Sequence, residues 1–328
     1  MTAPLLSVQD LMVRLGPLRP IHCIGFDVAA GEMLGIAGES GSGKSLTLRA
    51  ILGLLPPSAS VEGRVLWSGR DLLQLSPRAL AGVRGREIGM VFQEPMMALN
   101  PVLPIGLQIT ESLRAHLGLR GAAARTRAVE LLDRVGIPAA RERLGSFPHE
   151  FSGGMRQRVM IAIALAAEPK LLLADEPTTA LDVTIQDQIL KLLLRLRDEL
   201  AMSVVLVTHD LGVIAETCER VVIVYAGRVQ ESGPVAEIFA RPAHAYTAGL
   251  LRSLPDPRRA RERLVPIAGS PPDPTGLPAG CPFAPRCPAA IPACVAAVPP
   301  LAPAGPRRVS ACLRAAELTA RVLALAPA

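Results

Sequence analysis

A glycine-rich octapeptide near the start of the chain constrains the fold more than any other feature. It follows the pattern G-x-x-x-x-G-K-[ST] and consists of Gly38, Glu39, Ser40, Gly41, Ser42, Gly43, Lys44 and Ser45. An apolar run, 33–37, precedes it, and 46–52 follows it with helical spacing. A strand, a glycine loop and a helix in this order form a phosphate-binding loop, because backbone N–H groups converge there on an anion. Lys44 would hold the outer phosphates and Ser45 would bind Mg²⁺.

Composition excludes several classes of protein. Half of the 328 residues are hydrophobic and the net charge is only +6, so the chain is not intrinsically disordered. The longest mid-chain run without a charged or turn residue, 159–167, is much shorter than the ~20 residues of a membrane-spanning helix. No signal-peptide pattern opens the sequence. We therefore expect a cytoplasmic protein that reaches a membrane only through a partner.

The basic charge is concentrated in the last part of the chain. Residues 255–328 hold 9 arginines against 4 acidic residues, so most of the molecule is nearly neutral. With 1 Trp and 2 Tyr, the chain offers few rings for stacking on bases. We expect no nucleic-acid partner.

Two acidic residues follow a second apolar run. The run 171–174 reads as a buried strand and ends in Asp175 and Glu176. The C-terminal ends of strands are where α/β sheets place their chemistry. Next to a phosphate loop, Asp175 would hold Mg²⁺ and Glu176 would polarise the attacking water.

Two further strand ends offer polar side chains. The run 204–207 leads to His209, a plausible sensor of the terminal phosphate, and 88–92 leads to Gln93, which can touch both metal and water. Spacing alone supports these two assignments weakly, since a lone residue at a strand end is usually structural.

A serine–glycine sequence gives these motifs a family context. Ser152, Gly153, Gly154 and Met155 open a helical run just before the acidic strand. The segment resembles the signature motif of ATP-binding-cassette (ABC) ATPases. The octapeptide (Walker A), Gln93 (Q-loop), Asp175 and Glu176 (Walker B and catalytic glutamate), Asp182 (D-loop) and His209 (switch histidine) occur in the family's order.

The resemblance implies an α/β fold, the ABC-type P-loop nucleotide-binding domain. It implies a RecA-like core with an antiparallel β subdomain (1–93 with 169–235), a helical subdomain (94–168) and an irregular Cys- and Pro-rich C-terminal extension (236–328). In this family two cassettes pair head to tail, so the signature residues contact the ATP of the partner. The physical logic holds here, because a Ser-Gly-Gly helix N-terminus is a second anion-binding surface.

Details within the chain resemble the oligopeptide/dipeptide permease branch. They include 147–158, 174–183, 224–227 and the segment 242–247, in which His244-Ala245-Tyr246 stands where the branch usually has His-Pro-Tyr. The resemblance implies an ATPase that powers peptide import at the cytoplasmic face of the inner membrane. Its expected partners are a second, non-identical ATPase, two transmembrane permease subunits and an extracytoplasmic binding protein. Related permeases handle nickel or glutathione, and the motor sequence does not distinguish these cargoes.

Two departures from the general family pattern stand out. Leu15 occupies the place where many members carry an aromatic residue that stacks on adenine, so base stacking should be weak. Met155 replaces the more general Gln, as is usual in the peptide branch.

Four of the 6 cysteines lie in the extension, and 15 of the 31 prolines lie between Pro255 and Pro306. Cys281, Cys287, Cys294 and Cys312 have the spacing C-x5-C-x6-C-x17-C. Disulfides are disfavoured in a reducing compartment, and zinc sites more often use C-x₂₋₄-C pairs. Longer spacings suit a [4Fe–4S] cluster, which the permease resemblance also implies for some members. Zinc and unligated thiols remain the alternatives.

Other functional classes fit the sequence less well. Non-transport cassettes of the translation-factor type carry two cassettes in one chain, whereas this chain has one Walker A motif. Chromosome-maintenance ATPases insert long coiled coils between the two Walker motifs, whereas Lys44 and Asp175 are only 131 positions apart. A redox sensor with an inactive cassette would be favoured by loss of Glu176, which is present.

Overall fold

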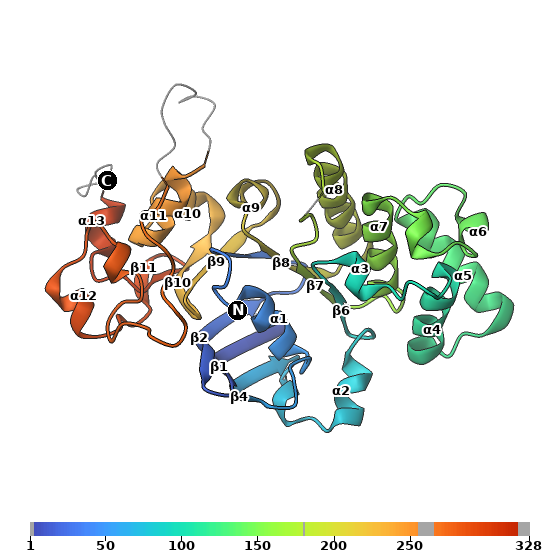
Figure 1. The fold of residues 1–328 in the computed structure, drawn as a ribbon, viewed down its shortest axis with the longest axis horizontal. Coiled ribbons are helices and arrows are strands. Elements are labelled where there is room, and N and C mark those ends of the chain that lie inside the picture. The colour runs from blue at the N-terminus through green and yellow to red at the C-terminus, as the bar shows by residue number, and fades with distance from the viewer. Residues whose placement is uncertain (1–2, 180, 255–265, 321–328) are drawn as a thin grey trace. The chain divides into compact units, whose positions relative to one another are not determined.

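The computed structural model describes residues 3–179, 181–254 and 266–320 (Figure 1). The chain divides into two compact units. One, here the phosphate-loop unit, comprises Met1–Val28, Met33–Leu73 and Thr208–Ala328; the other, here the helical unit, comprises Ala29–Glu32 and Gln74–Val207. The predicted helical subdomain thus lies within the helical unit, and the described part of the extension lies in the phosphate-loop unit.

The phosphate-loop unit is built on a mixed sheet. Its strands lie in the order β5-β4-β1-β2-β10-β9-β3. Their bounds are β1 Leu6–Leu15, β2 Leu18–Val28, β3 Met33–Ala37, β4 Ala59–Trp67, β5 Arg70–Asp71, β9 Arg220–Tyr225 and β10 Arg228–Pro234. The β1 strand pairs antiparallel with both β2 and β4, as the expected β subdomain requires.

Burial along these strands follows their position in the sheet. In β1, Leu6, Val8, Leu11 and Val13 are buried, and more exposed residues lie between several of them, as in a sheet with one face on the core. All five residues of β3 are buried, and this strand pairs parallel with β9. Such uniformly buried runs are typical of parallel strands covered on both faces.

The helices of this unit include the one that follows the phosphate loop. Their bounds are α1 Lys44–Ile51, α9 Leu211–Thr217, α10 Val235–Ala240, α11 Ala245–Arg252, α12 Pro292–Ala296 and α13 Ala315–Thr319, with 3₁₀ turns at Leu72–Gln74 and Ala284–Arg286. Hence the predicted strand–loop–helix order of the octapeptide is present in the structure.

The extension is more regular than its proline content predicts. Two short strands, β11 (Ala302–Gly305) and β12 (Arg308–Ser310), pair with each other, and β12 also pairs antiparallel with β10. The reason is local: 307–313 is free of proline, so β12 can join the ladder, while Pro303 lies on the outer strand β11.

The helical unit contains three parallel strands and most of the helices. The strand β7 (Leu171–Asp175) pairs with β6 (Ile88–Val91) and with β8 (Ser203–Thr208, whose last residue belongs to the other unit). The helices are α2 Pro77–Val83, α3 Pro95–Ala98, α4 Ile105–Leu117, α5 Gly121–Arg134, α6 Ala140–Arg143, α7 Gly153–Ala164 and α8 Val183–Leu200, with a 3₁₀ turn at Pro148–Glu150. The predicted strand 171–174 is confirmed.

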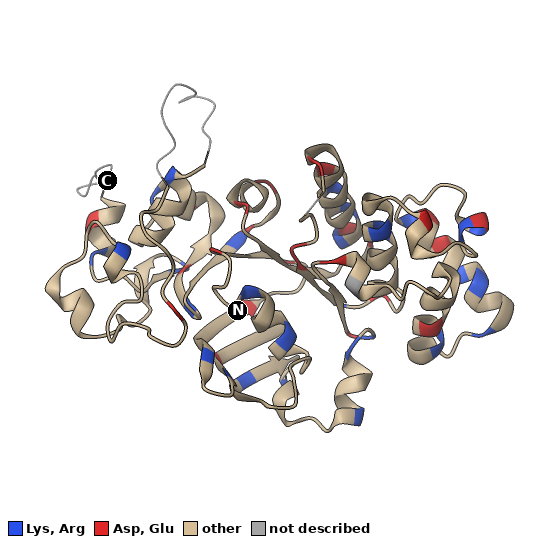
Figure 2. Ribbon diagram, viewed as in Figure 1, with Lys and Arg blue, Asp and Glu red and all other residues tan. Residues whose placement is uncertain are grey.

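Charges on these helices are mixed rather than gathered by sign (Figure 2). Arg127 pairs with Glu130 and Glu168, and Lys191 pairs with Asp187 on α8. Exposed pairs of this kind contribute little to stability and mainly keep the surface polar. Across the described residues, no helix combines the length and apolar character needed to cross a membrane.

Candidate nucleotide site

The phosphate loop has a backbone that only glycine adopts easily. Gly38, Gly41 and Gly43 have φ values of 154°, 76° and 102°. Gly43 is also the N-cap of α1, and a Cβ added to Gly38 would lie 2.1 Å from the carbonyl oxygen of Val224. The glycines predicted from the motif are therefore required by this loop geometry.

Polar groups of the loop are arranged as for an anion. The Lys44 side chain is buried, and its Nζ donates to the carbonyl oxygens of Gly38 (2.8 Å) and Glu39 (3.0 Å). The Ser42 Oγ is buried and has no hydrogen-bond partner among the described residues. Burying a hydroxyl without a partner is unfavourable, so a phosphate oxygen would complete this site. Ser45, the predicted Mg²⁺ ligand, is in the first turn of α1.

The helical unit brings together three other predicted residues. Asp175 is the last residue of β7 and is fully buried, and Glu176 follows it. The Gln93 Nε2 donates to Glu176 Oε2 at 3.3 Å, and Thr179 Oγ1 donates to the same oxygen at 2.8 Å. Because β6 and β7 are parallel, Gln93 and Asp175 follow the same ends of neighbouring strands.

Glu176 also has an unusual backbone. Its φ is 45°, in the left-handed region that a non-glycine residue adopts at a cost of about 1 kcal/mol or more. Such strain persists where the surrounding structure imposes it, and here it aims the carboxylate at Gln93 and Thr179.

The signature and D-loop residues lie at two helix N-termini of the helical unit. Ser152 is the N-cap of α7 and accepts from the Met155 N–H at 3.3 Å; Asp182 is the N-cap of α8 and accepts from Ile185 at 3.0 Å. A Cβ on Gly154 would come within 2.6 Å of the Ile185 side chain, so this glycine allows the two helix starts to approach. Ala180 of the D-loop lies outside the described residues.

The predicted set divides between the two units. The octapeptide and His209 belong to the phosphate-loop unit, whereas Gln93, Asp175, Glu176, the signature residues and Asp182 belong to the helical unit. His209 directly follows β8, and its neighbour Asp210 caps α9 by accepting from Gly212 at 2.8 Å. Leu15, at the expected adenine-stacking place, ends β1 and is half-buried.

The four cysteines of the extension line one small cavity. Cys281 and Cys294 are buried, and Cys287 and Cys312 are mostly buried; His244 and Phe283 line the same cavity. Burial raises the pKa of the Cys281, Cys287 and Cys312 thiols, that of Cys287 to about 11. The described residues include no set of three or more His, Cys, Asp or Glu side chains arranged to hold a metal ion. The sequence prediction of convergent cysteines is therefore met, and that of a metal centre is not supported by the geometry.

Sequence reasoning missed a second group of residues at the phosphate loop. Arg286 of the extension contacts Glu39, and Tyr246 contacts the Glu39 backbone. No local pattern in the sequence indicates this group, because Arg286 lies 247 positions from Glu39.

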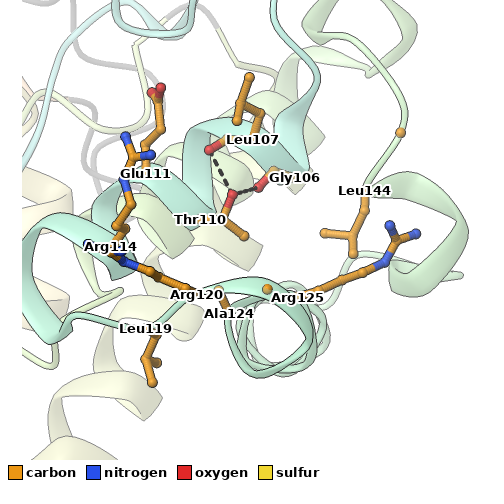
Figure 3. A pocket seen from close by; sticks show the side chains of 12 residues that line it. Gly106, Leu107, Thr110, Glu111, Arg114, Leu119, Arg120, Ala124, Arg125 and Leu144 are labelled. Atoms are coloured by element: carbon orange, nitrogen blue, oxygen red, sulfur yellow. Dashed lines mark hydrogen bonds between the residues drawn. The ribbon is translucent and has the colours of Figure 1, made fainter.

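The helical unit carries a groove (Figure 3). It is lined by α4 and α5 and includes Arg114, Arg120 and Arg125, with Glu111 and Leu107. Thr110 lies within it and donates to the carbonyl oxygens of Gly106 (2.8 Å) and Leu107 (3.0 Å), so this hydroxyl is already satisfied. No predicted site residue lines the groove.

Known proteins place the chain in a family. The model of ABC transporter ATP-binding domains matches residues 21–179, and that of the oligopeptide/dipeptide transporter C-terminal region matches residues 230–294. The chain belongs to the ABC transporter family of ATP-binding proteins, and it is an ATP-hydrolysing member by this relationship. Within the family it carries the C-terminal region of the oligopeptide/dipeptide branch.

Individual relatives cover nearly the whole chain. A peptide import ATP-binding protein from Brucella abortus is 51% identical over 93% of this chain and 94% of that protein. The oligopeptide transport ATP-binding protein OppD is 52% identical in Bacillus subtilis (86% of this chain, 81% of that protein) and 46% identical in Salmonella typhimurium (95% and 94%).

Solved structures support the fold. The cbiO1 protein of Clostridium perfringens, part of the ABC transporter complex cbiONQ, superposes with a TM-score of 0.63 at 29% identity over 73% of this chain and 92% of that one. The cassette MJ0796, solved as a dimer with ADP and Pi, gives 0.61 at 32% identity over 70% and 98%. The predicted ABC-type α/β fold is confirmed.

Proposed function

We propose that this chain is an ATP-hydrolysing subunit that powers the uptake of di- and oligopeptides across the inner membrane. The observation that carries the proposal is the C-terminal region 230–294, which matches the oligopeptide/dipeptide transporter region in addition to the ATP-binding domain. Near-full-length relatives named for peptide import support the same cargo class. Nickel or glutathione import, the alternative left open by the sequence, has no such support.

The residues of the phosphate-loop unit would bind the triphosphate of ATP. The backbone N–H groups of 38–45 and the N-terminus of α1 would face the phosphates, with Lys44 adding a positive charge and Ser42 a hydroxyl. His209 would contact the terminal phosphate. All these groups suit an anion, in line with the buried hydroxyl of Ser42.

The helical unit would supply the hydrolytic groups. Asp175 and Gln93, together with Ser45, offer the oxygen ligands that Mg²⁺ prefers, and the ion would neutralise charge that develops on the phosphates. Glu176, oriented by its hydrogen bonds with Gln93 and Thr179, would accept a proton from the attacking water. Ser152, Gly153, Gly154 and Met155, with Asp182, would contact the ATP bound to a partner cassette.

This arrangement requires partners. We propose a head-to-tail pair with a second, different ATPase subunit, held against two transmembrane permease subunits that receive cargo from an extracytoplasmic binding protein. The chain would then be peripheral, at the cytoplasmic face of the inner membrane.

The test is the ATPase activity, in membranes, of this chain co-expressed with the proposed ATPase and permease subunits. Purified binding protein is added with a di- and oligopeptide mixture, with Ni²⁺ or with glutathione. We expect that only the peptide mixture stimulates ATP hydrolysis. In Glu176→Gln, the hydrolysis rate due to this subunit should fall about a hundred-fold or more, because the attacking water loses its base. Stimulation by Ni²⁺ or glutathione alone would overturn the peptide assignment, and an unaffected Glu176→Gln complex would remove Glu176 from catalysis.

We further propose that the cysteine cavity holds a [4Fe–4S] cluster in the cell. The described residues show no side chains already arranged for a metal ion, so a cluster would have to draw together the four thiols that line the cavity, and Arg314, which also lines it, would offset the negative charge. Protein purified anaerobically should then contain iron and acid-labile sulfide, both lost in Cys287→Ser. Zinc without sulfide would favour the zinc alternative. If the protein contains neither iron nor zinc, the four cysteines are unligated thiols.

A further inference from the structure

The C-terminal extension forms hydrogen bonds with the phosphate loop at Glu39. Arg286 Nη1 donates to Glu39 Oε2 at 2.7 Å, and Nη2 donates to Oε1 at 3.0 Å. The backbone N–H of Glu39 donates to the Tyr246 hydroxyl at 2.8 Å. One loop residue is therefore held through its side chain and its backbone by two separate parts of the extension.

The Arg286 guanidinium also makes contacts with residues other than Glu39. Its Nε donates to the carbonyl oxygen of Ala268 at 2.9 Å, and its Nη1 also donates to the Tyr225 hydroxyl at 3.1 Å. The guanidinium lies 5.8 Å from the ring centre of Tyr225 and 5.9 Å from that of Phe283, and the side chain is only 6% exposed. A planar fork held on this many sides loses little freedom when it binds a carboxylate.

The aromatic rings form a rigid support. Tyr225 and Tyr246 have ring centres 4.6 Å apart, and Phe283 packs edge-on against Tyr225 at 5.5 Å and tilted against Tyr246 at 5.3 Å. Tyr225 ends β9, whereas Tyr246 and Phe283 belong to the extension. Arg286 is thus anchored to the core sheet and to the extension together.

The charge of Glu39 makes this contact relevant to ATP. Glu39 carries a carboxylate inside a loop whose other features favour an anion, and it adjoins Gly38, whose carbonyl oxygen accepts from Lys44. An unpaired carboxylate there would repel phosphates, whereas the paired one is neutralised. We propose that Arg286 is a positioning residue of the phosphate loop, through which the C-terminal extension sets the affinity for ATP. The proposal rests on the ATP-binding function proposed above.

The same turn also borders the cysteine cavity. Arg286 ends the 3₁₀ turn Ala284–Arg286, and the flanking Cys281 and Cys287 both line the cavity. Within the turn, Ala284 donates to the carbonyl oxygen of Cys281 and Cys287 donates to that of Ala284. A single turn therefore both contacts the phosphate loop and borders the cavity.

The test is a double-mutant cycle on the full-length protein, with ATP affinity measured by calorimetry at low and high salt. Arg286→Gln should weaken ATP binding about five-fold at low salt, since it leaves the Glu39 carboxylate unpaired. Glu39→Gln alone serves as the reference of the cycle, and Glu39→Gln/Arg286→Gln should recover most of the Arg286→Gln loss, because no unpaired carboxylate then remains in the loop. The Arg286→Gln defect should shrink as ionic strength rises, because salt screens the repulsion.

Glu317→Gln is the matched control. It removes the Arg314–Glu317 ion pair (2.5 Å) of the same extension without touching the phosphate loop, and it should leave ATP affinity unchanged. Equal affinities for the unmodified protein and Arg286→Gln, or equal losses in Arg286→Gln and the double variant, would overturn the proposal. If Arg286→Gln does not fold, Arg286→Met, which also removes the charge, replaces it in the cycle. An unmodified protein that binds no ATP would instead refute the function on which the proposal rests.

Discussion

Two arginine–glutamate pairs join the C-terminal extension to the rest of the phosphate-loop unit, and they differ in surroundings. Arg308 on β12 pairs with Glu231 on β10, and Arg286 pairs with Glu39 in the phosphate loop. The first joins two neighbouring strands of a sheet, because Glu231 faces Ser310 in the ladder. The second joins a turn to a loop that we propose binds ATP.

Groups of the protein itself satisfy the Glu231 carboxylate of the Arg308–Glu231 pair. The Glu231 side chain is fully buried and also accepts from the backbone N–H groups of Ala243 (2.9 Å) and His244 (3.1 Å). Glu39 is 25% exposed and shares its loop with a buried hydroxyl that has no partner among the described residues. The difference indicates that the first pair stabilises the fold, whereas the second pair can respond to a ligand.

The largest expected effect is on stability, in Arg308→Met. Leaving Glu231 buried without its arginine should lower the free energy of unfolding by about 3–5 kcal/mol. Chemical denaturation of the full-length protein measures this, and Arg286→Gln should cost much less in the same assay. Adding Glu231→Gln to Arg308→Met should recover much of the loss, because the neutral amide oxygen can still accept from the backbone of this segment. If Arg308→Met were as stable as the unmodified protein, the division between a structural and a positioning pair would be wrong.

The next largest effect is a dependence of the free energy of unfolding on pH, carried by His244, whose backbone N–H donates to Glu231. Burial lowers the pKa of His244 to about 4 from its ordinary 6.5, and its Nδ1 accepts from the Tyr246 N–H at 3.0 Å. Between pH 6.5 and 4, His244 therefore binds a proton in the unfolded chain but not in the folded one. Stability from this group is complete above pH 6.5 and falls as pH decreases toward 4, by up to about 3 kcal/mol.

Denaturation at a series of pH values between 7 and 4 measures this loss. His244→Asn should remove the share of the loss that His244 carries, since an asparagine oxygen can accept the same hydrogen bond without titrating. Burial also lowers the pKa of His22 to about 4, so His22→Gln is the comparison variant. A profile unchanged in His244→Asn would show that His244 does not carry the effect.

Local patterns predicted much of the fold and the candidate site. The octapeptide, the strand 171–175 and the serine N-cap of α7 all depend on residues close together in sequence, where apolar runs, glycines and caps act directly. Parallel pairing of β6 with β7 then explains why Gln93 reaches Glu176. By contrast, nothing local identified Arg286, because its partner Glu39 lies 247 positions away.

The extension was the least predictable region for the same reason. Its prolines predict an irregular segment, but β12 forms by pairing with β10, far away in the chain. The grouping of four cysteines was visible from their spacing in the sequence, whereas the placement of Arg286 between two of them, facing the phosphate loop, depends on the aromatic support of Tyr225, Tyr246 and Phe283.

The smallest effect distinguishes charge from geometry in the Arg286–Glu39 pair. Arg286→Lys keeps the positive charge but cannot make two parallel hydrogen bonds, so ATP affinity should fall only about two-fold. Its dependence on salt should match that of the unmodified protein, because Glu39 stays neutralised. Calorimetry measures the ATP affinities of Arg286→Lys and Arg286→Gln side by side. A lysine variant as weak as the glutamine variant, with a salt-independent loss, would mean that Arg286 acts by holding the shape of the loop rather than by cancelling the charge of Glu39.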